Sequence, residues 1–249
     1  MIDGGCGCVL GRIEQMIRRM FWEAGVEGLV IGVSGGVDSA VAAALCVRAV
    51  GADRVLALSL PSAVSAAEDL EDARELCRLL GCEHRTVSIE PVLDGFRAMP
   101  GYVETPYLLG NLMARARMVV LYYHANRDHR LVCGTSNRSE YLLGYSTKWG
   151  DSAADLQPIL HLFKHEVYQI GSELGIPQRI LERPPSAGLW VGQKDEDELG
   201  LSYDEIDRAL ATLVENGWKA QDEIEERVLA RVQASTHKRL GAFTLPSEG

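Results

Sequence analysis

The chain has 249 residues, 47% of them hydrophobic, so it is long enough for one large domain with a substantial core. Its formal net charge of −10 argues against a general nucleic-acid-binding surface, because polyanions are bound by basic patches. No apolar run reaches the ~18–20 residues of a membrane span, and the N-terminus shows no secretory signal. We therefore expect a single domain over 1–249 in a cytoplasmic protein that binds neither nucleic acid nor membrane.

The first half of the chain alternates between helix and strand patterns. We predict helices over 12–24, 38–50, 66–80 and 111–126, with Gly81 ending the third, and strands over 28–33, 54–60, 85–89 and 130–133. Strands alternating with helices predict an α/β fold with a doubly wound parallel sheet, whose core covers about 28–160. Ligands of such sheets bind beyond the carboxyl ends of the strands.

The C-terminal third, about 161–249, changes character. Helices are predicted over 164–174, 203–214 and 222–232, and a loop rich in Pro, Gly and Ser over 183–194. No low-complexity linker or internal repeat separates this helical and loop region from the sheet. We expect it to belong to the same domain.

The turn after the first strand has the composition of a phosphate-binding loop. It consists of Gly32, Val33, Ser34, Gly35, Gly36, Val37, Asp38 and Ser39. Adjacent glycines permit close approach of a ligand oxygen, and the N-terminus of the helix that follows attracts an anion. The serine hydroxyls add donors, and Asp38 suits a magnesium ion shared with phosphate oxygens.

This loop differs from two commoner glycine-rich motifs. No lysine follows Gly36 as in a Walker loop, and the spacing of a dinucleotide fingerprint is absent. A tight turn without a ligand is the alternative, but serine and aspartate beside the glycines disfavour it. The segment resembles the loop of the ATP pyrophosphatases, which cleave ATP between the α and β phosphates.

Polar residues in later segments supply further candidates. Thr135 follows the fourth predicted strand, and Glu140 lies on a short helix that begins at Asn137, within reach of the magnesium proposed at Asp38. A run rich in glycine and polar residues then carries Lys148 and Asp155, and Lys164 follows. The remaining candidates, which by themselves would be typical of a protein surface, are Arg115, Ser186, His237 and Lys238.

Together these motifs, in this order over about residues 10–240, resemble the ammonia-dependent NAD synthetases. The resemblance implies an adenine nucleotide alpha-hydrolase-like fold, a homodimer, and ATP-dependent amidation of nicotinic acid adenine dinucleotide (deamido-NAD) to NAD through an acyl-adenylate. It implies that the loop residues, Thr135, Lys164 and Ser186 bind ATP and that Asp38 and Glu140 hold Mg²⁺. Deamido-NAD would be bound by Arg115, Lys148, Asp155, His237 and Lys238.

In this interpretation Lys164 and Asp38 are the catalytic residues. No nitrilase-like glutaminase domain precedes residue 1, so we expect ammonia to come free or from a separate protein. The alternatives are another ATP pyrophosphatase, such as a tRNA-thiolating enzyme or the amidating domain of a GMP synthetase, and a nucleotide sensor without turnover. A thiolating enzyme calls for a catalytic cysteine pair and a basic surface, and a sensor would lack Lys164 or Glu140.

Overall fold

A computed structural model describes residues 6–242 and 244, except 187, 189 and 191. Within this part of the chain, four strands form one parallel sheet in the order β3-β2-β1-β4. Their bounds are β1 Gly28–Gly32, β2 Val55–Ser59, β3 Glu83–Thr86 and β4 Arg130–Cys133. Val30 of β1 pairs with Leu56 on one side and Val132 on the other. The parallel α/β architecture predicted from the sequence is confirmed.

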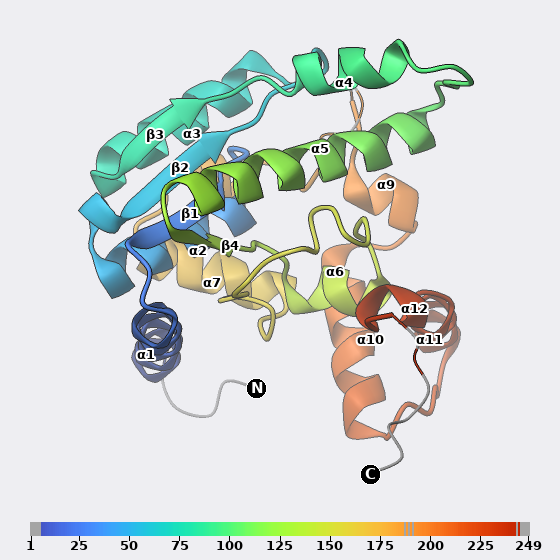
Figure 1. The fold of residues 1–249 in the computed structure, drawn as a ribbon. Coiled ribbons are helices and arrows are strands. Elements are labelled where there is room, and N and C mark those ends of the chain that lie inside the picture. Colours follow the sequence, from blue (N-terminus) through green and yellow to red (C-terminus); the bar gives the residue numbers. More distant parts are fainter. Residues whose placement is uncertain (1–5, 187, 189, 191, 243, 245–249) are drawn as a thin grey trace.

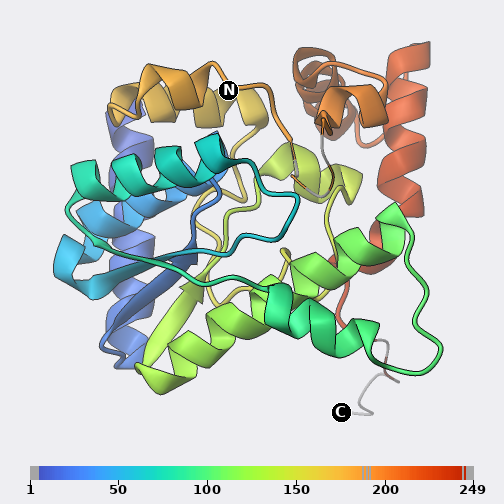
Figure 2. The same ribbon diagram turned by 90° about the horizontal axis from the view of Figure 1, so that it is seen from above.

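Helices cover both faces of this sheet (Figures 1 and 2). Helix α1 Cys6–Ala24 precedes the first strand. The helices between the strands and directly after them are α2 Val37–Val50, α3 Ala67–Leu80, α4 Glu90–Arg97, α5 Pro106–Arg127, α6 Arg138–Leu143, α7 Lys164–Glu173 and α8 Gln178–Leu181. The C-terminal helices are α9 Asp195–Leu199, α10 Tyr203–Glu215, α11 Glu223–Ala234 and α12 Thr236–Arg239, and a short 3₁₀ turn covers Ala52–Arg54.

Alternating strand residues build two separate cores. Leu29 and Ile31 of β1 face a core formed with α1, α2, α3, α7 and α8, whereas Val30 faces a core formed with α4 and α5. Successive side chains of a strand point to opposite faces, so a strand buried on both sides is apolar throughout. This burial explains why β1 and β2 are continuous hydrophobic runs and why they lie at the centre of the sheet.

A third core lies beside the sheet, where α6, α9, α10 and α11 pack together. Tyr203, Leu210 and Val228 are among its buried residues. This unit brings the C-terminal helices next to α6 and α7, which follow β4 in the chain (Figure 1). In the described part of the chain, no helix combines the length and the apolar character that crossing a bilayer demands.

The structure corrects several boundaries. The first helix begins at Cys6 rather than at residue 12, and the long helix begins at Pro106, where the Thr105 side chain accepts from Leu108 N. The strand predicted over 85–89 lies at 83–86 instead. Val87 N still donates to Ser59 O of β2, and Ile89 N donates to Pro61 O just beyond it. Ile89, however, already has helical backbone angles and is the N-cap of α4, a helix that the sequence did not predict. Residues 187, 189 and 191 of the predicted loop over 183–194 lie outside the described residues.

Candidate active site

The loop between β1 and α2 lies at the carboxyl edge of the sheet, as predicted. Gly35 has a φ of +86°, and a Cβ there would lie 2.5 Å from the carbonyl oxygen of Asp69, so only glycine fits. Ser39 Oγ donates to Gly36 O at 3.0 Å and accepts from Ser34 N at 3.2 Å, which closes the loop on itself. No side chain caps α2, whose N-cap residue is Gly36. The first N–H groups of this helix are therefore available to an anion.

Arg183, from a segment distant in the sequence, holds this loop in place through hydrogen bonds. Arg183 Nη1 donates to Gly35 O at 3.3 Å and to Asp69 Oδ1 at 2.5 Å, and its Nη2 pairs with Asp72 on α3. Arg179 contacts the same Asp72 carboxylate. Ser186, predicted to bind ATP, is exposed and follows three residues after Arg183. The arginine thus ties the segment that leads to Ser186 to the phosphate-binding loop.

Lys164 joins the two carboxylates that the sequence assigned to a metal. Its Nζ lies 2.5 Å from Asp38 Oδ2 and 3.0 Å from Glu140 Oε1, and its side chain is 3% exposed. Asp38 comes from the start of α2, Glu140 from α6 and Lys164 from the start of α7. Three elements far apart in the sequence therefore converge at the carboxyl edge of β1 and β4.

Electrostatics within this cluster are strongly coupled. Burial, reinforced by the neighbouring Asp38, raises the pKa of Glu140 to about 7, although Lys164 counteracts the increase. Burial alone would lower the pKa of Lys164, but the carboxylates of Asp38 and Glu140 outweigh it and raise that pKa. Lys164 is therefore a cation at neutral pH, whereas the pKa of Glu140 lies close to neutral pH.

Buried hydrogen bonds position the members of the cluster. Asn137, which caps α6, donates from Nδ2 to Asp38 Oδ1 at 2.9 Å. Lys164 N donates to Ser139 Oγ at 2.9 Å, and that hydroxyl in turn donates to the buried Asp207 of α10. The start of α7 is thus held from α6 and α10, which limits the positions that the Lys164 ammonium can reach.

The Glu140 side of the cluster continues into a network around Tyr203. The Tyr203 hydroxyl lies 3.3 Å from Glu140 Oε1 and 3.3 Å from Asp195 Oδ2. Asp195 also accepts from the Tyr145 hydroxyl at 3.1 Å. The sequence analysis assigned no role to Tyr203, Asp195 or Arg183, because each of them contacts a partner far away in the chain.

A cavity of about 290 Å³ adjoins the cluster, and two of the residues assigned to the dinucleotide, Lys148 and Lys238, line it. Glu140 lines it as well. Arg115 Nη2 donates to Lys148 O at 3.2 Å, and Lys148 Nζ donates to His237 O at 2.7 Å. Four candidates from α5, α12 and the segment between α6 and α7 therefore lie together.

The remaining predicted residues occupy different places. Asp155 does not line this cavity: its carboxylate accepts from Val132 N at 2.7 Å and from the Tyr122 hydroxyl at 3.2 Å, beside β4. Thr135 lies between β4 and α6 and is half-buried. Its place at the carboxyl edge of β4 agrees with the predicted neighbourhood of the nucleotide.

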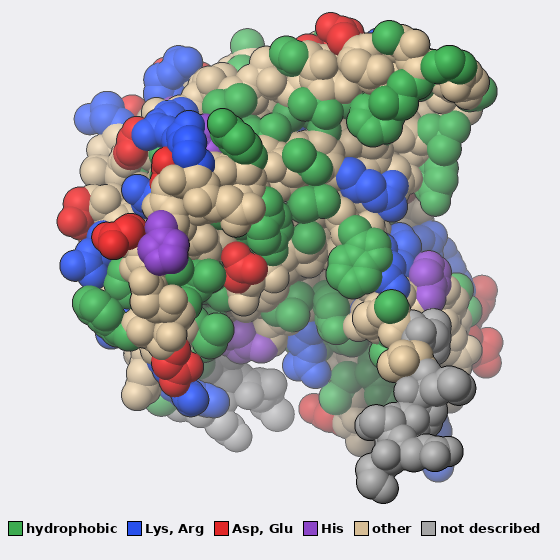
Figure 3. Space-filling model, viewed as in Figure 1, with side chains coloured by type: hydrophobic (Ala, Val, Ile, Leu, Met, Phe, Trp, Pro, Cys, Tyr) green, Lys and Arg blue, Asp and Glu red, His purple; other side chains and the backbone are tan. Residues whose placement is uncertain are grey.

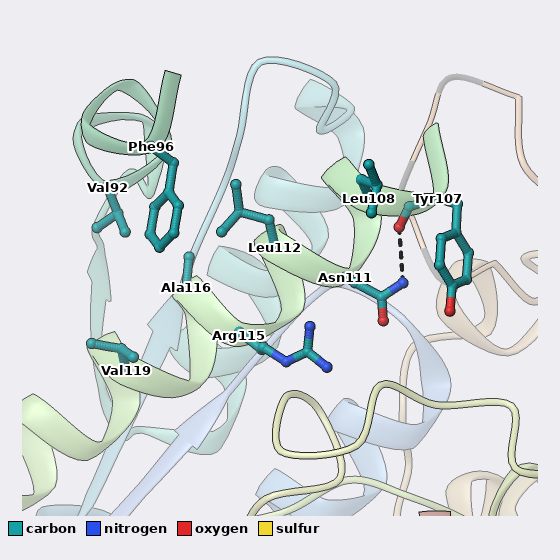
Figure 4. Close-up of a pocket in the computed structure, with 9 residues that line it drawn as sticks. All are labelled: Val92, Phe96, Tyr107, Leu108, Asn111, Leu112, Arg115, Ala116 and Val119. Carbon is teal, nitrogen blue, oxygen red and sulfur yellow. Dashed lines mark hydrogen bonds between the residues drawn. The ribbon is translucent and has the colours of Figure 1, made fainter. Parts of the chain in front are cut away.

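A second cavity, of about 350 Å³, lies on the outer side of α5 and is mostly apolar (Figure 4). Phe96 and Val92 of α4 line one end of the cavity, and Tyr107, Leu108 and Asn111 line it from the start of α5. Arg115 extends from the same helix (Figure 4). Hydrophobic side chains also gather over α4 and α5 on the surface (Figure 3).

Comparisons with known proteins agree with this geometry. The family model of NAD synthase matches residues 9–242. The chain is 64% identical to the NH(3)-dependent NAD(+) synthetase of Methanoregula boonei, over 97% of each chain. It resembles the structure of an NMN synthetase from Francisella tularensis with a TM-score of 0.89 and 40% identity, covering 98% of this chain and 100% of that one. For an NH3-dependent NAD synthetase from Campylobacter jejuni the TM-score is 0.82, with 32% identity and 96% and 98% coverage.

The sequence match spans both the sheet and the C-terminal helices, and it includes the loop, Glu140, Lys164 and the cavity beside them. The chain therefore belongs to the NAD synthase family.

Proposed function

We propose that the cluster around Lys164 amidates nicotinic acid adenine dinucleotide with ammonia and ATP, yielding NAD, AMP and pyrophosphate. The observation that carries the proposal is the convergence of Asp38, Glu140 and Lys164 between the phosphate-binding loop and a cavity lined with cationic groups. The family to which the chain belongs agrees with this activity.

The reaction needs activation because a carboxylate is a poor acyl donor. A nicotinate oxygen attacks the α-phosphorus of ATP, the bond to the β-phosphate oxygen breaks, and pyrophosphate leaves. Ammonia then attacks the acyl carbon, AMP departs with the bonding electron pair, and a proton is released to solvent. Catalysis of this kind rests on positioning and on stabilising charge.

The residues of this chain divide these tasks. The N-terminus of α2 and the serines of the loop would hold the β and γ phosphates. Lys164, fixed by Asp38 and Glu140, would place its ammonium beside the transferring phosphoryl group and neutralise charge that develops there. Thr135 and Ser186 would add hydroxyl donors to the nucleotide.

The carboxylates of Asp38 and Glu140 also fit Mg²⁺. This ion is typically held by one or two protein carboxylates together with substrate phosphates and water, and no group of three or more metal-binding side chains occurs among the described residues. Bound there with ATP, it would neutralise the charge of the departing pyrophosphate. We propose Asp38 and Glu140 as its protein ligands.

The dinucleotide would enter through the cavity beside Glu140. Lys148 and Lys238 line it, and Arg115 and His237 contact Lys148. These four residues would bind the phosphates and ribose, since cationic donors suit phosphate oxygens. We also propose Asp155 as a contact of the dinucleotide; in this structure its carboxylate accepts from Val132 N and from the Tyr122 hydroxyl.

A second candidate substrate is nicotinic acid mononucleotide, which would be converted to NMN by the same chemistry. It is favoured by the likeness to the structure of an NMN synthetase. The same adenylation would then act on a substrate without the adenosine half. Comparing kcat/KM for the two nicotinate substrates decides between them.

We also propose that the protein is a cytoplasmic homodimer. Tyr107 is 76% exposed, Val119 is 54% exposed, and Met99 is 53% exposed, so the α4–α5 surface has apolar area for a second copy to cover. Cys8, Cys46, Cys77, Cys82 and Cys133 carry free thiols, as is usual in reducing compartments. Light scattering of the wild type and of Tyr107→Asp tests the dimer; a monomeric wild type would contradict it.

The activity is tested with purified protein, ATP, MgCl₂, ammonium and deamido-NAD. We expect NAD, AMP and pyrophosphate in equal amounts, and ADP as product would contradict the mechanism. Without ammonium, we expect labelled pyrophosphate to exchange into ATP only when deamido-NAD is present, because an acyl-adenylate forms reversibly. Exchange that is independent of deamido-NAD would contradict an acyl-adenylate.

A further inference from the structure

Trp149 is a bulky residue in a backbone conformation that suits glycine. It is the third residue of a tight turn in which Gly150 N donates to Thr147 O at 2.9 Å, and its φ is +61°. Turns with a positive φ at this position usually carry Gly or Asn there. For a large side chain this conformation is strained, so packing or function must compensate for it.

Packing does not compensate, because the Trp149 side chain is 56% exposed. The tryptophan could not stand at the next position, Gly150, either. A Cβ at Gly150 would lie 2.9 Å from Thr147 Cγ2 and 3.1 Å from Ala114 Cβ, so that position requires a small residue. The turn therefore keeps an exposed indole at the one position that strains it.

The turn itself is firmly held. Arg115 of α5 donates to Lys148 O, Lys148 Nζ donates to His237 O, and Ser152 Oγ donates to Thr147 O at 3.0 Å. Two helices and the following loop thus fix the backbone beside Trp149. An aromatic side chain on such a support is pre-organised for contact with a ligand.

Trp149 and Glu140 both line the cavity of about 290 Å³. Lys148 Nζ lies 5.2 Å from the centre of the Trp149 ring. The reacting carboxylate must approach the Lys164 cluster, to which Glu140 belongs, so the flat nicotinate ring is the part of the substrate that enters this cavity first.

We propose that Trp149 is the stacking surface for the nicotinate ring, a contact that rests on the proposed function and deepens it. The indole face would cover the pyridine ring while Lys148 attracts the adjoining anionic groups. Strain in the empty turn is the consequence of presenting a rigid aromatic plane to the substrate.

The test uses Trp149→Asn and Trp149→Phe, with Trp218→Asn as matched control. Trp218 also has a positive φ, 63°, and is 39% exposed, but it lines neither cavity described above. Asparagine tolerates positive φ, so both asparagine variants should melt at the wild-type temperature or above it. A Trp149 that merely stabilises the fold would give a lower melting temperature in Trp149→Asn.

Calorimetry without ATP measures binding apart from turnover. Aromatic stacking on a base is worth enough that Trp149→Asn should bind deamido-NAD about tenfold or more weakly. Trp149→Phe should recover most of the affinity, Trp218→Asn should match the wild type, and ATP affinity should be equal in all. Wild-type affinity for deamido-NAD in Trp149→Asn, or an equal loss of ATP affinity, would overturn the proposal.

Two shorter ligands locate the contact. Nicotinic acid mononucleotide should quench tryptophan fluorescence in the wild type and not in Trp149→Phe, whereas AMP should quench neither. Quenching by AMP that depends on Trp149 would mean that the indole binds adenine instead. If the wild type binds deamido-NAD through Trp149 but makes no NAD, the proposed function fails and the stacking proposal stands.

Discussion

Replacing Lys164 by methionine separates its structural role from its catalytic role. Methionine keeps the length of the side chain but removes the ammonium that lies 2.5 Å from Asp38 and 3.0 Å from Glu140. Two neighbouring carboxylates then lose the cation between them. Removing one partner of a buried ion pair costs ~3–5 kcal/mol, because an uncompensated charge stays behind.

The expected fall in melting temperature follows from that cost. Since 1 kcal/mol shifts the midpoint of a 150–250-residue domain by roughly 2–4 °C, Lys164→Met should melt roughly 6–20 °C lower. NAD formation should fall by ~10²–10³, the usual loss when one pre-organised donor is removed. Lys219→Met is the control: Lys219 is exposed, and its loss should change neither quantity.

A double variant provides the decisive comparison. Asp38→Asn removes one of the carboxylates that Lys164 compensates, so adding it to Lys164→Met should recover part of the lost stability. It should recover no activity, because the donor to the phosphoryl group is still missing. Recovered NAD formation in the double variant would show that Lys164 only balances charge and would refute its catalytic role.

Three further predictions concern the loop and the metal. Gly35→Ala should lower both the melting temperature and the affinity for ATP, because its Cβ would lie 2.5 Å from a carbonyl oxygen. In Gly36→Ala the nearest atom would lie at 3.4 Å, so this variant should keep the wild-type melting temperature and lose only activity. Equal melting temperatures of the two variants would contradict this difference. Arg183→Met should raise the KM for ATP more than it lowers kcat, while Arg179→Met, which leaves the Gly35 carbonyl contact intact, should change only the melting temperature. Chelating divalent ions should abolish NAD formation, and added Mg²⁺ should restore it; undiminished activity in chelator would exclude the metal.

The sequence was sufficient to predict the sheet and the loop because the signals are local. A run of apolar residues buried on both faces marks β1, and adjacent glycines before an alanine-rich helix mark the turn that follows. The helix α4 was missed because Ile89, buried against β2, completes a strand-like pattern although its backbone is already helical. An apolar residue indicates that a position is buried, but a buried position can belong to a helix as well as to a strand.

The arrangement of the candidate site was less accessible, because it depends on contacts between distant segments. Asp38 and Lys164 are 126 residues apart, and only the packing of α2 against α7 brings them together. Their chemistry followed from a family resemblance, not from spacing. Arg183 had no such help: an arginine before two prolines is unremarkable until the structure places its guanidinium on the Gly35 carbonyl.

The charges of the site lead us to expect different positions for the phosphates of the two substrates. Asp38, Glu140 and Lys164 together leave an excess of negative charge next to the loop. This charge repels the phosphates of ATP, so we expect ATP to bind there together with a cation. Magnesium and ATP should therefore bind together, each lowering the cost of the other. The cavity beside Glu140 is also lined by Lys148 and Lys238, which need no added ion to receive phosphates. A dinucleotide whose phosphates lie beside Lys148 and Lys238 would keep their negative charge away from the carboxylates of Asp38 and Glu140.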